Sequence, residues 1–510
     1  MAFGAILLVT LWIDFSSIHR HHNADSLVPV LISLQQWTPL FWEQDRLGML
    51  IPLLALPFKH PLANLLVQYG VTTFCALGCF FLLGWYAAGR RHATTIGSIC
   101  GILLLGCLTS QQRFDCLMYF HQYATSLSLG LAALILLGEW QRSGRWYCVA
   151  ASLMLMLGAH WVNPSIAFAL GPLAILGPLL PANRAHRPLS RQESGWMKRN
   201  PLPAAERTNG LEIEPAPAIV AGVSLVAVSL LASIALSRAA AEPLPYGFVS
   251  PGQWWLCAVG IIDYMPANIR PKLFKFLLGL FCGALATLGW TAGRRELRRS
   301  ALVLLALLIP ALVQFAFMAS LDHVHRTHYG HYVFAAVFLL IGGVSAFVVF
   351  QFAALLPARF AAPGSRALLI AFVVVGMVRQ GPPSLGAVRQ GLDQAAGAYT
   401  AELLEARCTH VTGDYWRVWP AVFHANLELR ERGASGTVWG IAQRALPTTA
   451  QWSQVPLSAT RIAEIKGDEA QALHARRHYR VSETTVVAEL SKIRVLAPVA
   501  LANTAPRPGR

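Results

Sequence analysis

Three acidic residues, Asp25, Glu43 and Asp45, lie in a stretch that is otherwise rich in apolar and aromatic side chains, residues 19–60. Carboxylates at a lipid surface cost free energy unless they are solvated or paired, so acids in such a place are candidates for function. Asp25 could act as a general base toward a hydroxyl, while Glu43 or Asp45 could position a substrate, a metal ion or a leaving phosphate. The alternative is a solvated interfacial loop, in which Asp25 caps a helix and Arg46 pairs with Glu43 or Asp45.

A second candidate for the base is Asp14, near the outer end of the first apolar run. Acids inside membrane spans are functional candidates by default. A leaving phosphate also needs cationic or hydrogen-bonding partners. Arg46, Arg270 and Lys272 are cations on the same predicted side of the membrane that could serve this purpose.

Histidines gather in residues 321–333, LDHVHRTHYGHYV. Asp322, His323 and His325 could together supply oxygen and nitrogen ligands to zinc or another divalent ion. Their spacing matches no known zinc motif, and histidines in loops are usually solvated. The sequence therefore predicts no defined metal site and leaves a divalent cofactor open.

The elements that must position these residues are membrane spans. Of the 510 residues, 55% are hydrophobic and 13% are charged, whereas about a quarter of the residues of a soluble globular protein are charged. This composition excludes a soluble enzyme. Apolar runs long enough to cross a bilayer predict an all-α polytopic protein with about eleven spans, near residues 3–18, 61–88, 93–110, 124–139, 146–161, 164–181, 216–236, 273–292, 300–319, 331–351 and 366–379.

The formal net charge of +16 comes from 41 basic and 25 acidic residues. In a soluble protein this excess would suggest a nucleic-acid partner. Here basic residues such as Arg90 and Arg142 follow alternate spans, where the positive-inside rule places cytoplasmic loops. We therefore predict no nucleic-acid partner, a cytoplasmic N-terminus and a cytoplasmic loop at residues 182–215. Residues 19–60 then form the first external loop, in which an amphipathic stretch, residues 27–42, could lie flat on the bilayer.

The composition changes near residue 380, after which no stretch could span a membrane. We predict a transmembrane domain over residues 1–379 and an extracytoplasmic soluble α/β lobe over residues 380–510. Residues 395–407 and 417–432 have helical periodicity, and residues 410–412 and 437–441 are typical of short buried strands. The aromatic cluster at residues 413–420 could stack on a sugar or a peptide, but packing onto the lobe's own core or the membrane is favoured.

This architecture resembles the GT-C superfamily of integral membrane glycosyltransferases, to which protein O-mannosyltransferases and the bacterial aminoarabinose transferase of lipid A belong. The resemblance covers most of the chain as architecture. Its motifs are Asp25, near the start of the first external loop, and the triplet Glu43-Gln44-Asp45. It implies that Asp25 is the base or positions the acceptor, that Glu43 or Asp45 stands for a second acidic motif, and that the donor is a polyprenyl phosphate with its tail in the bilayer.

GT-C enzymes often carry an Arg-Tyr pair near the donor phosphate, at the start of a late span. The matching pair here is His331-Tyr332, with Arg326 five residues earlier. The resemblance implies that these residues bind substrate, although a neutral His stabilises a phosphate less well than Arg.

We expect a glycosyltransferase of a bacterial cytoplasmic membrane that moves a sugar from a lipid-linked donor to an envelope glycan, lipid or protein. A bacterial source is indicated by the excess of Arg over Lys, which is typical of a GC-rich genome. The alternatives are a transporter or flippase of lipid-linked sugars and a non-catalytic membrane scaffold. Few charges lie within the spans, which argues against the transporter, and the acid-rich first loop argues against the scaffold.

Overall fold

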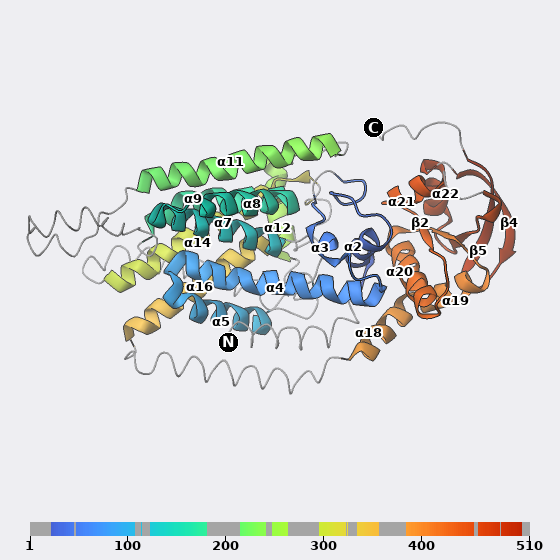
Figure 1. Ribbon diagram of the computed structural model, residues 1–510, viewed down its shortest axis with the longest axis horizontal. Coiled ribbons are helices and arrows are strands. Elements are labelled where there is room, and N and C mark those ends of the chain that lie inside the picture. Colours follow the sequence, from blue (N-terminus) through green and yellow to red (C-terminus); the bar gives the residue numbers. More distant parts are fainter. Residues whose placement is uncertain are drawn as a thin grey trace, which may run out of the picture.

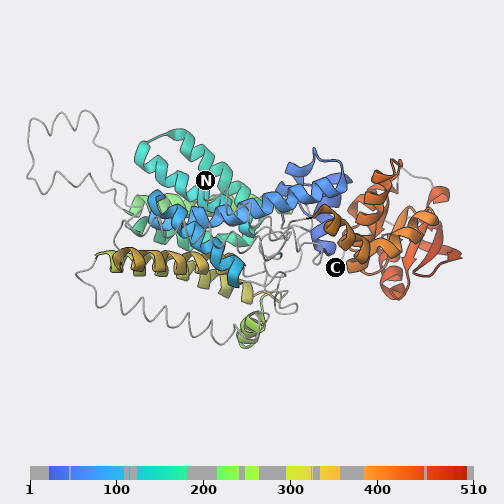
Figure 2. The ribbon, with the colours of Figure 1, turned by 90° about the horizontal axis from the view of Figure 1, so that it is seen from below.

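The computed structural model has two parts, a bundle of long helices and a lobe that contains a β-sheet (Figure 1). Two short helices, α2 (Ala24–Leu34) and α3 (Leu50–Ala55), lie between them. The view from below shows the same order along the long axis (Figure 2). The structure describes residues 22–44, 47–107, 114, 123–180, 215–240, 247–263, 295–322, 324, 334–355, 384–452, 457–479 and 481–501.

The bundle consists of apolar helices that pack side by side. Two hairpins turn at Gly89 and Gly144, whose φ angles of 81° and 68° lie in the left-handed region that favours glycine. The helices are α4 (Pro61–Ala88), α5 (Arg90–Cys107), α7 (Tyr123–Ser143), α8 (Trp146–Val162), α9 (Ala167–Leu176), α11 (Pro215–Ala240), α12 (Pro251–Asp263), α14 (Arg295–Ala319) and α16 (Phe334–Leu355).

Among the described residues, four helices are long and apolar enough to cross a membrane: Pro61–Ala88, Tyr123–Ser143, Pro215–Ala239 and Ala301–Ala319. A fifth span results if the bent pair Trp146–Val162 and Pro164–Leu179 counts as one. The protein is therefore compatible with a membrane, but these spans are fewer than the eleven predicted. Three of the eleven predicted spans, near residues 3–18, 273–292 and 366–379, lie outside the described residues.

The bent pair replaces two spans that the sequence pattern separates, at residues 146–161 and 164–181. Its two arms are bent by 117°. The bend lies at Asn163, whose side chain accepts a hydrogen bond from the Ser165 amide and caps the short helix η2 (Pro164–Ile166). Pro164 explains the break, because the residue before a proline is disfavoured in the helical conformation. A second short helix, η3 (Gly177–Leu179), ends the returning arm.

Helix α2 is buried, which corrects the prediction of a surface helix over residues 27–42. It begins at the cap Asn23, ends at Leu34, and buries its side chains from Ser26 to Ser33. Helix α20 of the lobe packs against it, and α4 of the bundle also contacts it. The apolar face that would otherwise meet lipid is therefore covered by protein.

Polar side chains of α4 fix α2 to the bundle. The buried amide of Gln68 donates hydrogen bonds to the Pro29 carbonyl (3.2 Å), to Ser33 Oγ (3.1 Å) and to Asn64 Oδ1 (2.8 Å). Asn64 in turn donates to the carbonyl of Ala55, at the end of α3 (2.9 Å). Hydrogen bonds inside an apolar environment are strong and leave few alternatives, so this network determines where α2 lies.

The lobe is a small α/β unit, as expected. Its five-stranded sheet has the order β2-β1-β3-β5-β4, in which β1 is parallel to β2 and β3, while β5 is antiparallel to β3 and β4. The strands are β1 (His410–Thr412), β2 (Trp439–Ile441), β3 (Ile462–Ile465), β4 (Val481–Glu489) and β5 (Ile493–Leu501). The helices are α18 (Leu385–Leu392), the π-helical turn η5 (Asp393–Gly397), α19 (Ala398–Glu405), α20 (Tyr415–Glu431), α21 (Leu446–Gln451), η6 (Leu457–Ala459) and α22 (Glu469–His478).

The lobe elements predicted from periodicity are confirmed with small changes of boundary. The strand predicted at 410–412 is β1, the one at 437–441 contains β2, and the helix at 417–432 is α20. The helix predicted at 395–407 is divided between η5 and α19. Because β1 and β2 are parallel, the residues that follow them lie together at the carboxyl ends of these strands. This end of the sheet contacts the segment that contains α2.

Candidate functional site

Asp25 lies in the first turn of α2, next to the lobe. The helix is capped by Asn23, whose side chain accepts from the Ser26 amide (3.0 Å) while Ser26 Oγ accepts from the Asn23 amide (3.0 Å). Asp25 is therefore in the first turn and is not the cap, and its charge is favourable near a helix N-terminus. Its side chain is half-buried and accepts a hydrogen bond from the hydroxyl of Tyr415.

Tyr415 is the first residue of α20, immediately beyond the carboxyl end of β1. Asp414 caps the helix by accepting a hydrogen bond from the Trp416 amide (2.9 Å). Gly413 precedes the cap with a φ angle of 153°, and a Cβ there would lie 3.2 Å from Ile465 Cβ. The tight turn at Gly413 thus brings β1 directly into α20 and places Tyr415 at the edge of the sheet.

The Tyr415 hydroxyl is held in its protonated form. Burial raises its pKa well above the usual value, and the nearby charge of Asp25 raises the pKa further, while the Arg444 guanidinium lowers it. Because loss of the proton is disfavoured beside a carboxylate in a buried place, Tyr415 acts as a neutral donor to Asp25.

Glu43 contacts the lobe at a second place. Its carboxylate accepts hydrogen bonds from the Arg444 amide (2.9 Å) and from the Tyr479 hydroxyl, which lies 2.8 Å from both carboxylate oxygens. Arg444 Nη1 also donates to the Glu43 carbonyl (3.1 Å). Burial and then the charge of Glu43 raise the pKa of Tyr479, so this hydroxyl is a neutral donor as well.

Glu43 and Arg444 both have left-handed backbone conformations, with φ angles of 57° and 76°. Within the described part of the chain only one other residue besides glycine, Arg407, has a positive φ. Such conformations cost about 1–3 kcal/mol each and persist where the surroundings determine them, often at functional sites. That two of them contact each other directly is a reason to examine this place for function.

Arg444 connects the two acids. It follows β2 and interacts with the Tyr415 hydroxyl as well as with Glu43. Its guanidinium also lies 5.4 Å from the centroid of the Phe41 ring. We call the set Asp25, Glu43, Tyr415, Arg444 and Tyr479 the junction; the first two come from the N-terminal segment and the other three from the lobe.

An apolar contact between the same two segments lies next to the junction. The rings of Trp42 and Trp419 lie 5.9 Å apart, and both side chains are fully buried. Gly440 on β2 leaves room for Trp419, since a Cβ there would lie 2.6 Å from its ring. Gln35 adds a polar contact by donating to the Val438 carbonyl (3.0 Å).

These contacts resolve the role of the aromatic cluster at residues 413–420. Trp419 packs in the core, as favoured from the sequence. Trp416 is 45% exposed and lies with its ring edge against Tyr415, at a centroid distance of 5.1 Å. Tyr415 is the member of the cluster whose hydroxyl contacts Asp25.

The junction lies where parallel sheets commonly bind ligands, outside the carboxyl ends of the strands. Tyr415 follows β1 and Arg444 follows β2. Its two carboxylates accept hydrogen bonds from hydroxyls and from a backbone amide. Two carboxylates placed in this way are candidates for a general base and for stabilising a developing positive charge.

Of the predicted site residues, the structure places Asp25 and Glu43 against the lobe, Asp25 through Tyr415 and Glu43 through Arg444 and Tyr479. The other predicted site residues lie outside the described residues; they are Asp45, Arg46, Arg270, Lys272, Arg326, His331 and Tyr332, together with Asp14. Tyr415 was noted only as part of the aromatic cluster, and Arg444 and Tyr479 carry no sequence signal, since their partners are 401 and 436 residues away.

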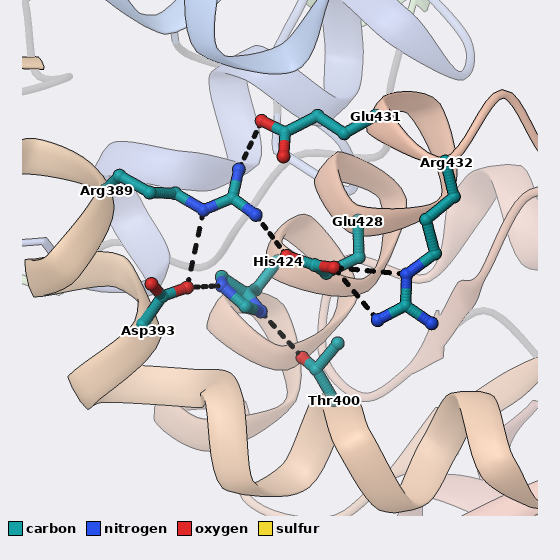
Figure 3. A network of polar contacts seen from close by, with 7 residues as sticks. All are labelled: Arg389, Asp393, Thr400, His424, Glu428, Glu431 and Arg432. Atoms are coloured by element: carbon teal, nitrogen blue, oxygen red, sulfur yellow. Dashed lines mark hydrogen bonds and ion pairs between the residues drawn. The ribbon is translucent and has the colours of Figure 1, made fainter. Parts of the chain in front are cut away.

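A second polar cluster lies within the lobe and joins η5 to α20 (Figure 3). Ligand atoms of Asp393, His424 and Glu428 lie within 4.8 Å of one another, a spacing that could hold a metal ion. However, His424 Nε2 lies 2.6 Å from Asp393 Oδ1, and its Nδ1 lies 2.9 Å from the Thr400 hydroxyl. Both ring nitrogens therefore already have partners.

The carboxylates of this second cluster are also engaged. Arg389 forms ion pairs with Asp393 (3.4 Å), Glu428 and Glu431, and Arg432 pairs with Glu428 (3.1 Å). Cations at these oxygens oppose the binding of a metal ion. We call these residues the His424 cluster and interpret it as a brace between helices. The metal ligands considered from the sequence, His323 and His325, lie outside the described residues.

No protein-family model matches the chain, and a search of curated proteins finds no match either.

Proposed function

We propose that this protein is an integral membrane glycosyltransferase of a bacterial cytoplasmic membrane. In this proposal a sugar moves from a polyprenyl-phosphate donor to an acceptor on the outer face, which is an envelope glycan, lipid or protein. The observation that supports it best is the meeting of Asp25 and Glu43 with the lobe at one end of the helical bundle. A lipid-linked donor keeps its tail in the bilayer, so its reacting carbon must lie near the ends of the spans.

The arrangement of basic residues supports the proposed orientation. Helix α4 contacts α2 and α20, and its 28 residues extend about 42 Å, which carries Arg90 away from the lobe. Helix α8 ends beside the N-terminal segment, where the Gly48 amide donates to the Trp161 carbonyl (2.9 Å). Its other end, at Arg145, therefore also lies away from the lobe. The positive-inside rule favours a cytoplasmic location for such ends, which leaves the lobe outside.

In the proposed reaction Asp25 accepts the proton of an acceptor hydroxyl while the hydroxyl oxygen bonds to the anomeric carbon of the sugar. The bond from that carbon to the donor phosphate breaks, and the phosphate leaves with the bonding electrons. Glu43 contributes negative charge beside a sugar ring that becomes electron-poor. Arg326, His331, Tyr332, Arg46, Arg270 and Lys272 are proposed to bind the substrate, as the sequence suggests.

The test is a transfer assay in proteoliposomes that contain radiolabelled polyprenyl-phosphate sugars and a mixture of envelope acceptors. Asp25→Asn removes the base and still offers an oxygen to Tyr415, so the fold is expected to persist while transfer is lost. Glu405→Gln, at an exposed position of α19, is the matched control and should retain transfer. Undiminished transfer by Asp25→Asn would exclude Asp25 as the base, and loss in Asp14→Asn alone would move the base there.

A second candidate function is transport of a lipid-linked sugar, which one observation favours. The bent pair of α8 and α9 breaks at Asn163, and transporters often build binding sites at such discontinuous helices. Flux of a labelled lipid-linked sugar across the proteoliposome membrane, with no sugar transferred to any acceptor, would support transport and exclude the transferase.

A further inference from the structure

We propose that the C-terminal lobe positions the two acids of the junction, with Tyr415 as the positioning residue of Asp25 and Tyr479 as that of Glu43. The effect on catalysis rests on the proposed function, whereas the positioning itself is a property of the contacts. The lobe would then be part of the active site, and a chain with an undocked lobe would lack an ordered site.

The donors to both carboxylates come from distant parts of the chain. The hydrogen bond from Tyr415 to Asp25 joins residues 390 apart, and that from Tyr479 to Glu43 joins residues 436 apart. A carboxylate in the first turn of a helix can otherwise adopt several rotamers. The Tyr415 hydroxyl of the lobe is a donor that favours one of them.

Tyrosine suits this purpose because its hydroxyl orients a carboxylate without adding a positive charge. Both hydroxyls are buried beside an acid, which keeps them protonated. A guanidinium in the same place would form an ion pair and compete with a proton for the carboxylate. The two hydroxyls thus orient the carboxylates of the junction, while the Arg444 guanidinium donates to the Glu43 carbonyl.

Glu43 is held more firmly than a single hydrogen bond would achieve. The Arg444 amide and the Tyr479 hydroxyl bind its carboxylate, and Arg444 Nη1 binds its carbonyl. The left-handed conformations of Glu43 and Arg444 bring these groups together. Main chain and side chain of one acid are therefore both fixed by the lobe.

A purely structural role for the tyrosines is the competing explanation. Docking of the lobe has a separate apolar basis, because Trp42 packs on Trp419 and α20 packs along α2. Removal of one hydroxyl leaves these contacts in place. Gln35 provides a matched control, since its hydrogen bond to Val438 also joins the two parts of the molecule but touches neither acid.

The first measurement is the kinetics of transfer by Tyr415→Phe, Tyr479→Phe and Gln35→Met in proteoliposomes. Tyr415→Phe is expected to lower kcat roughly 10- to 100-fold with little change in KM for the donor, because only the orientation of the base is lost. Tyr479→Phe should have a smaller effect in the same direction, since two donors from Arg444 remain. Gln35→Met should resemble the wild type in both constants.

The second measurement does not depend on activity. Purified full-length protein is treated with a water-soluble carbodiimide and glycinamide, and modification of Asp25 and Glu43 is followed by peptide mass spectrometry. Tyr415→Phe is expected to increase the labelling rate of Asp25 about fivefold and leave Glu43 unchanged, as loss of one hydrogen bond implies. Tyr479→Phe should show the opposite selectivity. Hydrogen exchange of residues 24–34 should be the same in all variants.

The outcomes separate the two proposals. Selective labelling without any sugar transfer by the wild type would refute the proposed function and support the positioning role. Wild-type transfer with equal labelling in all variants and unchanged kcat would overturn the positioning role alone. Faster hydrogen exchange of α2 in Tyr415→Phe would also overturn it, because the hydroxyl would then be needed for docking.

Discussion

The junction and the His424 cluster both gather acids on helices, but they satisfy them differently. In the His424 cluster, Arg389 forms ion pairs with Asp393, Glu428 and Glu431. In the junction, Asp25 and Glu43 accept hydrogen bonds from tyrosine hydroxyls and one backbone amide. The carboxylates of the His424 cluster are thus paired directly with guanidinium groups, whereas in the junction tyrosine hydroxyls donate to the carboxylates and the Arg444 guanidinium donates to the Glu43 carbonyl.

The two clusters also differ in what they join. The His424 cluster connects α18, η5, α19 and α20, all of which are parts of the lobe (Figure 3). The junction connects the N-terminal segment to Tyr415 at the start of α20, to Arg444 after β2 and to Tyr479 after α22. A cluster inside one unit can stabilise that unit, while a cluster between two units can assemble a site from both. The difference teaches that the number of acids in a cluster says less about its role than which units of the molecule it joins.

The largest contrast is expected from removing one carboxylate in each cluster. Asp25→Asn should lower kcat for transfer roughly 10²- to 10⁴-fold, the usual contribution of a general base. Asp393→Asn should leave kcat within about twofold, since Asp393 is a partner in a brace that does not touch the site. Equal losses in the two variants, measured in the proteoliposome assay, would remove the distinction between the clusters.

The apolar support of the junction should matter more for stability than for chemistry. Trp419→Ala is expected to destabilise the lobe by about 3–5 kcal/mol, because it leaves a cavity where a fully buried ring packs on Trp42. Trp416→Ala, at the exposed neighbour, is the control and should change stability by less than about 0.5 kcal/mol. Chemical denaturation monitored by hydrogen exchange of lobe peptides would compare the two.

A pH dependence should arise in the lobe from His410. This side chain is fully buried at the start of β1, and burial lowers its pKa from 6.5 to about 4. The unfolded chain therefore binds a proton at a higher pH than the folded chain does. The stability of the lobe should be complete above pH 6.5 and fall by about 3 kcal/mol as the pH decreases to 4. His410→Gln should flatten this dependence in denaturation curves, and an unchanged slope would contradict the assignment.

A smaller effect is expected from one carboxylate of the His424 cluster. Glu428→Gln should reduce the stability of the lobe by about 1–2 kcal/mol, since Arg389 and Arg432 each lose an ionic partner at a partly exposed place. Transfer should be unaffected. A thermal melt of Glu428→Gln beside Glu405→Gln would measure the difference, and a loss of kcat in the former would show that the cluster reaches the site.

The smallest effect is expected from metal ions. Neither added zinc nor a chelator should shift the unfolding temperature of the lobe by more than about 1 °C, because binding would stabilise only the folded state if a site existed. Thermal melts with and without zinc would test this directly. A shift of several degrees that disappears in His424→Phe would instead identify the His424 cluster as a metal site.

Parts of the fold were predictable because their signals are local. The apolar run at residues 61–88 coincides with α4, and the strand at 410–412 coincides with β1. Long apolar runs and short buried strands depend on neighbouring residues, so they can be recognised in the sequence. The sequence did not predict the break at Asn163. The hydrophobic pattern indicates two separate spans there and contains no information on the angle between the two helices.

The candidate site was predictable only in part. Asp25 and Glu43 could be selected from the sequence because acids are scarce among the apolar residues of the N-terminal segment. Their partners could not be selected: Tyr415 was noted only as part of an aromatic cluster, and Arg444 and Tyr479 lie 401 and 436 residues from Glu43. Contacts between residues this distant depend on how two separately folded parts pack, and a single sequence contains no local signal for that packing.

The sequence by itself determined that the chain forms apolar helices long enough to cross a membrane and an α/β lobe, and that acids are scarce in its N-terminal segment. These properties follow from composition and short-range periodicity. Only the tertiary structure decided that α2 is buried under α20 and does not lie on the bilayer, and that neutral hydroxyls of the lobe hold the acids. The physical reason is that burial and hydrogen bonding between α2 and the lobe exist only once segments about 400 residues apart have packed together.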